Sequence, residues 1–197
     1  MQPKVGIVGG NAHLLEPALQ KYHYERIDPD TSPEEFRQFG LTHLVSFGYR
    51  QLIPEAVLAH FGGRVFNIHI SLLPWNRGSD PNFWSWFEGT PKGVSLHQIT
   101  RKLDSGPLIG QREISFGADE TLATSYQRLL ETGVDLFAEY LESLLWMELK
   151  FKFVSGDGSY HSSRDFGSFE YVLESGWDTP CSVVEDWGRR LGRRENP

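Results

Sequence analysis

The chain has 197 residues, with 26 acidic and 19 basic side chains, a formal net charge of −7 and a pI near 5.5. This length suits one compact domain that can bury a substantial core. The acidic balance disfavours a general binder of nucleic acid or anionic membranes, because both need a basic surface.

The remaining composition also narrows the class of protein. A single cysteine, Cys181, excludes an intrachain disulfide and a cysteine-based metal site, and it favours a reducing, cytoplasmic setting. No apolar run approaches the roughly 20 residues of a membrane span, and the first residues lack the pattern of a signal peptide. The arginine-rich end is interpreted as a solvated tail, with contact to a phosphate or partner as the alternative; it contains Arg189, Arg190, Arg193 and Arg194.

Strand and helix patterns alternate over the first third of the chain. Apolar alternation that breaks at glycines predicts strands, and Ser32 followed by proline and two glutamates predicts the start of a helix. A glycine pair at 62–63 predicts the end of another helix. The predicted strands are KVGIVGG, YERID, THLVSFGY and RVFNIHISLLP, and the predicted helices cover 14–22, the segment after Ser32, and 54–61.

The pattern changes after residue 90. GVSLHQI and LIGQREISF predict two antiparallel strands at a sheet edge, and a long amphipathic helix is predicted from about Thr121 to Met147. These features indicate an α/β fold with a mostly parallel twisted sheet, antiparallel edge strands and flanking helices. We expect a single domain over 1–197, with a core of about 1–150 and a turn-rich extension of about 151–197 that holds no second core.

Two polar residues interrupt the fourth predicted strand. Asn67 and His69 are two residues apart, so they share one face of the strand, opposite Phe66 and Ile68. The C-terminal end of a parallel strand is where open α/β sheets bind ligands. An imidazole there can carry a proton near neutral pH, an adjacent carboxamide N–H can stabilise a developing oxyanion, and Asp104, on the loop between the edge strands, can orient the imidazole. A purely structural role for the histidine is the alternative.

Other catalytic arrangements have less support. There is no G-x-S-x-G nucleophile motif, and Cys181 lies far from this segment, which disfavours a covalent acyl-enzyme. The remaining histidines show no paired metal-ligand spacing, so no metal is expected. Direct attack by a substrate amine, with His69 as the proton acceptor, suits these residues better.

The motifs themselves resemble a known family. N-x-H-x-S-L-L-P at 67–74, R-G at 77–78 and D-S-G-P-L-I at 104–109 resemble the folate-dependent formyltransferases, over roughly residues 44–147. The resemblance implies a Rossmann-like formyltransferase fold and 10-formyltetrahydrofolate as co-substrate. It implies that Asn67 binds the formyl oxygen, that His69 serves as acid and base, and that Asp104 orients His69 or holds a proton-relaying water.

The resemblance also implies where the folate binds. In the family, the folate head group lies against a loop after a strand and against backbone just before the catalytic aspartate. The corresponding segments are S-F-G-Y-R at 46–50 and H-Q-I-T-R-K-L at 97–103. The implied folate-binding residues are Phe47, Gly48, Tyr49, Ile99 and Leu103, with ordinary strand-end packing as the alternative for Phe47 and Tyr49.

The loop P-W-N-R-G-S-D-P-N-F-W-S-W resembles the sugar N-formyltransferases, which act on nucleotide-linked amino deoxysugars made for surface polysaccharides. This implies that Trp75 stacks on sugar or base and that Arg77 pairs with a pyrophosphate oxygen, with packing on a short helix as the alternative for Trp75. Trp84 and Trp86 are expected to pack in the interior. The segment 158–166 is expected either to close over the substrate or to form a solvated turn. The implied substrate-binding residues are Gly10, Trp75, Asn76, Arg77, His161 and Arg164.

Alternative functions remain open at this point. A reaction of the phosphoribosylglycinamide formyltransferase type is one, although V-G-G-N-A-H at 8–13 lacks the serine of that enzyme's phosphate loop. Formylation of tRNA is disfavoured by the acidic charge and by the short segment after the long helix. Hydrolysis of formyltetrahydrofolate and a non-catalytic folate or nucleotide-sugar binding module are further alternatives. By analogy with the sugar enzymes, a homodimer through the region 151–169 is also expected.

Overall fold

The computed structural model describes residues 2–153 and 156–191, so Arg193 and Arg194 of the predicted tail lie outside the described residues. Its main sheet has the strand order β2-β1-β3-β4-β6-β7. The first four of these strands in sequence are parallel, and β6 and β7 are antiparallel to their neighbours, which confirms the predicted mixed sheet. The strands are β1 (Lys4–Val8), β2 (His23–Ile27), β3 (His43–Phe47), β4 (Val65–His69), β6 (Gly93–Gln98) and β7 (Leu108–Glu113).

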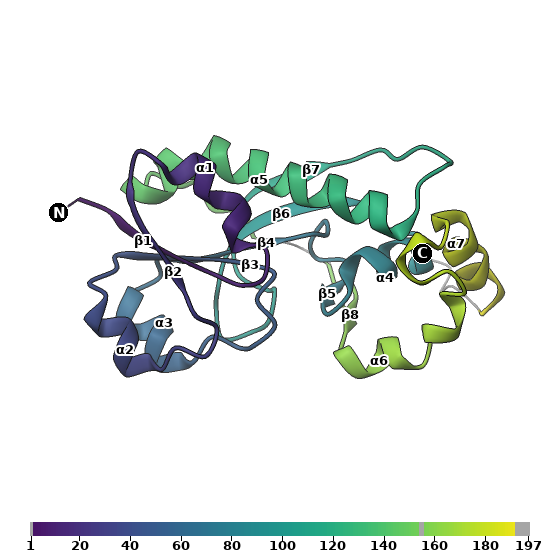
Figure 1. Cartoon of the computed structure of the whole chain (residues 1–197), viewed down its shortest axis with the longest axis horizontal. Coiled ribbons are helices and arrows are strands. Elements are labelled where there is room, and N and C mark those ends of the chain that lie inside the picture. Colours follow the sequence, from purple (N-terminus) through teal and green to yellow (C-terminus); the bar gives the residue numbers. More distant parts are fainter. Residues whose placement is uncertain (1, 154–155, 192–197) are drawn as a thin grey trace.

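Helices cover both faces of this sheet (Figure 1). A 3₁₀ turn, η1 (Ala12–Leu15), the short α1 (Glu16–Leu19) and the long α5 (Leu122–Trp146) pack on one face. The other face carries α2 (Pro33–Gln38) and α3 (Glu55–Phe61). Successive side chains along a strand alternate between the two cores. On β4, Phe66 and Ile68 face α5, and Val65 faces α2 and α3.

The helix boundaries follow the chemistry that predicted them. Ser32 and Glu35 form a capping box at the start of α2, which satisfies two backbone N–H groups that have no partner inside the helix. Thr121 caps α5, and α5 ends where Met147 adopts a left-handed conformation. The end of α3 lies at Gly62, whose φ of 55° is readily adopted by glycine.

Two predicted elements are shorter than expected. The helix predicted at 14–22 is wrong in extent: η1 and α1 together end at Leu19. The chain then turns, and Tyr22 N donates to the oxygen of Leu19 at 2.8 Å, which is a turn contact and not a continuation of the helix. The fourth strand ends at His69. Beyond it the chain turns into the loop that leads to β5 (Arg77–Gly78).

The C-terminal extension forms a second packed region at the end of the molecule opposite the N-terminus (Figure 1). The expectation that it holds no second core is wrong. The aromatic side chains of α4 (Pro81–Glu88) pack there against Leu122, Val172, Cys181 and Val184. Its elements are β8 (Tyr160–His161), α6 (Ser163–Gly167), η2 (Glu170–Val172), η3 (Gly176–Asp178) and α7 (Cys181–Arg190).

The prediction failed because half of this core comes from a distant segment. Trp84 and Trp86, which were expected to pack, are 3% and 7% exposed, and they come from α4 rather than from the extension. A Cβ at Gly188 would lie 1.8 Å from the carbonyl oxygen of Phe87, so α7 approaches α4 as closely as backbones allow. Within the described residues, no helix is both long and apolar enough to cross a membrane.

Candidate active site

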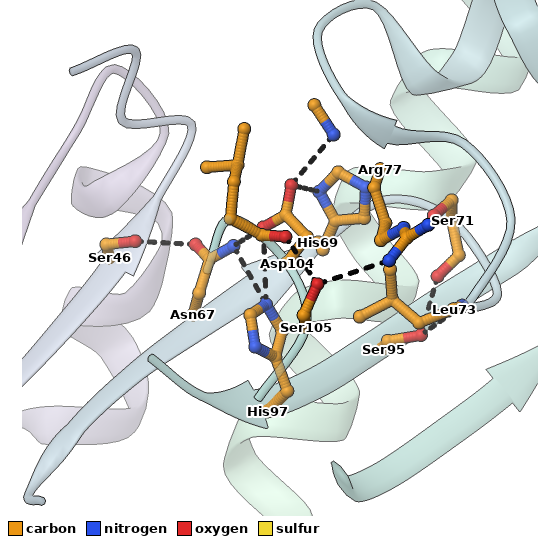
Figure 2. A network of polar contacts seen from close by, with 12 residues as sticks. Ser46, Asn67, His69, Ser71, Leu73, Arg77, Ser95, His97, Asp104 and Ser105 are labelled. Carbon is orange, nitrogen blue, oxygen red and sulfur yellow. Dashed lines mark hydrogen bonds and ion pairs between the residues drawn. The ribbon is translucent and has the colours of Figure 1, made fainter. Parts of the chain in front are cut away.

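Three polar side chains form a row across the middle of the sheet. Ser46 of β3 and His97 of β6 are the direct register partners of Asn67 on β4. Ser46 Oγ donates to Asn67 Oδ1 at 2.5 Å, and Asn67 Nδ2 lies 3.2 Å from Nε2 of His97 (Figure 2). These contacts assign the two ends of the carboxamide, so that its N–H groups point toward the loop that carries Asp104.

The ring of His69 is held by one nitrogen and open at the other. Its side chain is 8% exposed, and Nε2 lies 2.9 Å from the main-chain oxygen of Asn76. Since a carbonyl oxygen can only accept, Nε2 carries a hydrogen. Nδ1 then faces Asp104, with 3.8 Å between Nδ1 and Oδ2. This arrangement leaves Nδ1 as the nitrogen that can take up and release a proton.

Asp104 reaches this ring from the loop between β6 and β7. Its φ is 44°, in the left-handed region, and a main-chain N–H at Gly78 donates to Oδ2 at 2.9 Å. A Cβ at Gly106 would lie 1.7 Å from the oxygen of Gln98, so the turn behind Asp104 requires glycine. The other carboxylate oxygen, Oδ1, lies 3.4 Å from Asn67 Nδ2.

The charge of Asp104 is maintained by its neighbours. Burial by itself acts to raise the pKa of this carboxyl group, whose side chain is 7% exposed. The opposing effects are the positive charge of His69 and the hydrogen bond and charge of His97, which together hold the pKa of Asp104 well below its usual range. The carboxylate is therefore ionised at neutral pH and stabilises a cationic His69 ring.

His97 is a site residue that sequence reasoning missed. It is 1% exposed, its Nδ1 lies 3.1 Å from the carbonyl oxygen of Gln98, and its Nε2 lies 3.5 Å from Asp104 Oδ1. When His97 is neutral, Nε2 accepts from Asn67; when it is protonated, Nε2 donates to Asp104. His97 lies in the strand predicted at GVSLHQI, but only the register with β4 places it opposite Asn67.

The predicted substrate residues Asn76 and Arg77 lie beside the site but are already bonded. Asn76 is fully buried, and its side chain contacts Thr90, Glu88 and Ser159. Arg77 donates to main-chain oxygens in the extension and to Ser105 Oγ at 3.2 Å, next to Asp104. The structure thus brings both residues to the site as supports of the loops that carry His69 and Asp104.

The predicted folate residues other than Phe47 lie on two neighbouring loops, 48–54 and 99–104. Tyr49 and Ile99 pack on the edge of the α2–α3 core, and an exposed ion pair joins Arg101 of the second loop to Glu55 at the start of α3. Phe47 is 1% exposed in the main core. Leu103 is 41% exposed, and Leu52, which was not predicted, is 70% exposed.

The other predicted substrate residues are spread more widely. Gly10 lies at the C-terminal end of β1, beside a pocket of ≈ 420 Å³ that also contains Arg26 and Asp28. Trp75 lines a separate pocket of ≈ 370 Å³ with Leu72, Leu73, Pro74, Pro91, Gln111 and Glu113. His161 stacks on Trp84 and pairs with Glu88, and Arg164 is exposed on α6.

Metal ligation has no geometric support in residues 2–153 and 156–191. No three histidine, cysteine, aspartate or glutamate side chains in this part of the chain come together as a group that could hold an ion. The buried charges at the site are instead matched by one another and by backbone N–H groups.

Comparisons with known proteins show the family of the chain. The model of the formyl transferase family matches residues 14–141, well over half of the chain. The chain therefore belongs to the formyl transferase family.

Individual relatives show which members it resembles. The chain is 34% identical to the formyltransferase PseJ from Anoxybacillus kamchatkensis, solved with UDP-4,6-dideoxy-4-formamido-L-AltNAc and tetrahydrofolate; the TM-score is 0.86, covering 94% of this chain and 99% of PseJ. It is 30% identical over 123 residues to dTDP-4-amino-4,6-dideoxyglucose formyltransferase of Mycobacterium tuberculosis, covering 62% of this chain and 52% of that protein. It is also 30% identical over 132 residues to methionyl-tRNA formyltransferase of Listeria monocytogenes, covering 66% of this chain and 42% of that protein. The chain thus spans about half the length of these two curated relatives.

Proposed function

We propose that this protein is an N-formyltransferase that moves the formyl group of 10-formyltetrahydrofolate to the primary amine of a nucleotide-linked amino deoxysugar. The observation that carries this proposal is the convergence of Asn67, His69 and Asp104 in one partly buried polar network (Figure 2). The similarity to PseJ over nearly the whole of both chains supports the substrate class.

The residues divide the chemistry between them. An amine attacks the formyl carbon, and the carbonyl oxygen gains negative charge. An Asn67 Nδ2–H stabilises this charge in place of its 3.4 Å contact with Asp104 Oδ1. His69 Nδ1 accepts the proton that the amine loses, and Asp104 stabilises the resulting cation across 3.8 Å. His69 then returns the proton to the folate nitrogen as its bond to the formyl carbon breaks, so that tetrahydrofolate and the formamide leave with all protons balanced.

The folate would lie between the loops 48–54 and 99–104. Leu52 and Leu103 expose apolar side chains on these two loops, and Ile99 and Tyr49 line their base. Burial of such exposed apolar surface by an aromatic ring system is favourable. These residues therefore suit the co-substrate that the family uses.

The first loop of the chain favours a sugar over a ribonucleotide phosphate as acceptor. A phosphate-binding loop needs free main-chain N–H groups. Here the N–H groups of Gly10, Asn11 and Ala12 donate to the oxygens of Gly48, Phe47 and Gly9 at 3.2, 3.1 and 3.1 Å. This supports the sugar-directed reaction over the purine-synthesis alternative.

An acceptor panel tests the proposal. The protein is mixed with 10-formyltetrahydrofolate and, separately, nucleotide-linked 4-amino sugars, nucleotide-linked 3-amino sugars, glycinamide ribonucleotide or no amine, and tetrahydrofolate release is followed by absorbance. We expect release with amino sugars only. Release with glycinamide ribonucleotide would instead assign purine synthesis, and release without an amine would assign a hydrolase. No release from folded protein that binds folate would favour a binding module.

A further inference from the structure

The C-terminal extension lies directly against the loop that precedes α4. Ser159 N donates to the oxygen of Pro74 at 3.2 Å, and Arg77 N donates to the oxygen of Ser159 at 3.0 Å. A Cβ at Gly158 would lie 2.0 Å from the Pro74 oxygen, and one at Gly78 would lie 2.2 Å from the His161 oxygen. Two glycines at φ of 60° and 91° therefore allow the two backbones to meet with no side chain between them.

One side chain from the extension supports the residue that anchors the catalytic histidine. Ser159 Oγ accepts from Asn76 N at 2.9 Å and donates to Glu88 Oε2 at 2.8 Å. Asn76 Nδ2 donates to the same carboxylate oxygen at 3.0 Å, and Thr90 Oγ1 donates to Asn76 Oδ1 at 2.8 Å. Both polar side-chain atoms of the buried Asn76 thus have hydrogen-bond partners, and its φ is 54°. Its main-chain oxygen is directed at His69 Nε2.

A second residue of the extension neutralises the charge at the centre of this support. Glu88 lies at the end of α4, and its Oε1 is 3.0 Å from His161 Nε2. The His161 ring lies parallel to that of Trp84, at 7° and 3.8 Å between centroids. Burial acts to raise the pKa of Glu88, but hydrogen bonds from His161, Ser159 and Asn76 and the charge of His161 lower it, so the carboxylate stays ionised.

We infer that residues 157–161 of the extension are a positioning element of the active site, which acts through Asn76 to fix the Nε2–H form of His69. The chain of contacts runs from Ser159 and His161 to Glu88, from there to Asn76, and from Asn76 to His69. If the loop at 76 shifts, Nε2 loses its acceptor and the proton can move to Nδ1, which removes the base that faces Asp104. This inference concerns the mechanism of the proposed function and rests on it.

The same segment also supports the other side of the site. Arg77 donates through its guanidinium to the main-chain oxygens of Asp157 and Ser159, at 2.8 and 3.4 Å, and to Ser105 Oγ. Ser105 follows Asp104 directly, so the extension is connected to both partners of the His69–Asp104 pair. Packing alone does not require this many polar contacts directed at the two catalytic loops.

The test compares Ser159→Ala with a hydroxyl-retaining variant and a matched control. Ser159→Thr keeps the oxygen that accepts from Asn76, and Ser168→Ala removes an exposed hydroxyl from the same extension. Thermal unfolding establishes that each variant is folded. The steady-state rate is measured with the acceptor found active, and kcat is separated from KM for both substrates.

A readout without turnover separates this inference from the proposed function. The tautomer of His69 is measured by long-range ¹H–¹⁵N NMR on ¹⁵N-histidine protein, and its signals are assigned by their loss in His69→Gln. Wild type is expected to show a slowly exchanging Nε2–H. Since the loss of one buried hydrogen bond changes equilibria by about tenfold, Ser159→Ala should lower kcat about tenfold, leave KM within about twofold, and speed exchange of that hydrogen.

Each outcome decides one of the two questions. Loss of the Nε2–H signal in Ser159→Ala but not in Ser159→Thr or Ser168→Ala supports the positioning role even if no formyl transfer is found. An unchanged His69 tautomer and unchanged kcat in folded Ser159→Ala would overturn the inference while leaving the proposed function intact. If Ser159→Ala does not fold, His161→Gln gives the same comparison, because it removes the charge opposite Glu88 and leaves Ser159 in place.

Discussion

The main-chain oxygen of Asn76 lies 2.9 Å from Nε2 of His69, and Asn76 is itself fully buried. In the proposed reaction, this contact decides which nitrogen of the imidazole can exchange a proton. Nε2 is the fixed end, and Nδ1, which faces Asp104, is the end proposed to exchange a proton. Asn76 therefore bonds to one nitrogen of His69, and the carboxylate of Asp104 faces the other nitrogen at 3.8 Å.

The first prediction concerns this reactive nitrogen. His69→Ala should lower kcat for formyl transfer by about 10²- to 10⁴-fold, because that is the usual contribution of a general acid and base. Folate binding, measured by calorimetry, should persist, since the proposed contacts of the folate apart from its reacting atoms come from the loops 48–54 and 99–104. His23→Ala, which changes an exposed histidine on β2, serves as control. Wild-type turnover in folded His69→Ala would contradict the assignment.

The second prediction concerns the orientation of the Asn67 carboxamide. His97→Gln should lower kcat about tenfold and change KM for folate little, because Nε2 of His97 no longer directs Asn67 Nδ2 toward the oxyanion position. His60→Gln, which alters an exposed histidine on α3, controls for the change of residue type. Equal kcat in His97→Gln and wild type would mean that Ser46 alone is enough to orient the carboxamide.

The sequence was sufficient to place Asn67 and His69 on one face, because alternation along a strand depends only on local geometry. The structure confirms this, with Phe66 and Ile68 packed on the opposite face. The mixed parallel and antiparallel character of the sheet and the presence of the long helix were also predictable from local patterns. Ser46 and His97 were not recognised, because their place opposite Asn67 depends on the register of three strands that are far apart in sequence.

The extension shows the same limit more strongly. Its contacts with the site join Ser159 to Asn76 across 83 residues and to Glu88 across 71 residues. No local periodicity records such pairings, so the segment 158–166 could be interpreted only as a substrate lid or a solvated turn. In the structure, His161 is instead held between Trp84 and Glu88, and Arg164 points from an exposed turn of α6.

The third prediction concerns stability at acid pH. The pKa of Asp104 is lowered in the folded protein, so its stabilising contribution is fully present above the unfolded carboxyl pKa of about 3.9 and is lost as the pH falls below it. In that range the unfolded chain binds a proton that the folded chain does not. Asp104→Asn should therefore have a shallower decline of unfolding free energy below about pH 4 than wild type.

Urea unfolding at a series of pH values from 6 downward measures this slope. Asp119→Asn, which removes an exposed carboxylate before α5, is the matched control. If Asp104→Asn and Asp119→Asn decline with the same slope as wild type, then Asp104 is not held ionised by the two histidines.

The fourth prediction concerns Cys181, the single cysteine of the chain. It is 2% exposed at the start of α7, with Sγ 3.7 Å from Ser125 Oγ, and burial raises its pKa to about 12. The thiolate is the reactive species, so at pH 8 the folded protein should react with a disulfide reagent far more slowly than the unfolded protein. Because the unfolded thiol ionises above about pH 8.5 while the folded one does not, stability should also fall as the pH rises beyond that value.

Labelling in increasing urea measures the exposure of Cys181. At full unfolding, one equivalent of the disulfide reagent should react per chain. A labelling transition that coincides with loss of helix signal would show that the packing of α7 on α4 is as stable as the main sheet. A transition at lower urea would show that the extension opens first. In that case turnover should be lost at the same urea concentration at which labelling begins. The reason is that residues 157–161 then no longer support Asn76, while the sheet that carries His69 is still folded. Rapid labelling of the native protein at pH 8 would contradict the burial of Cys181.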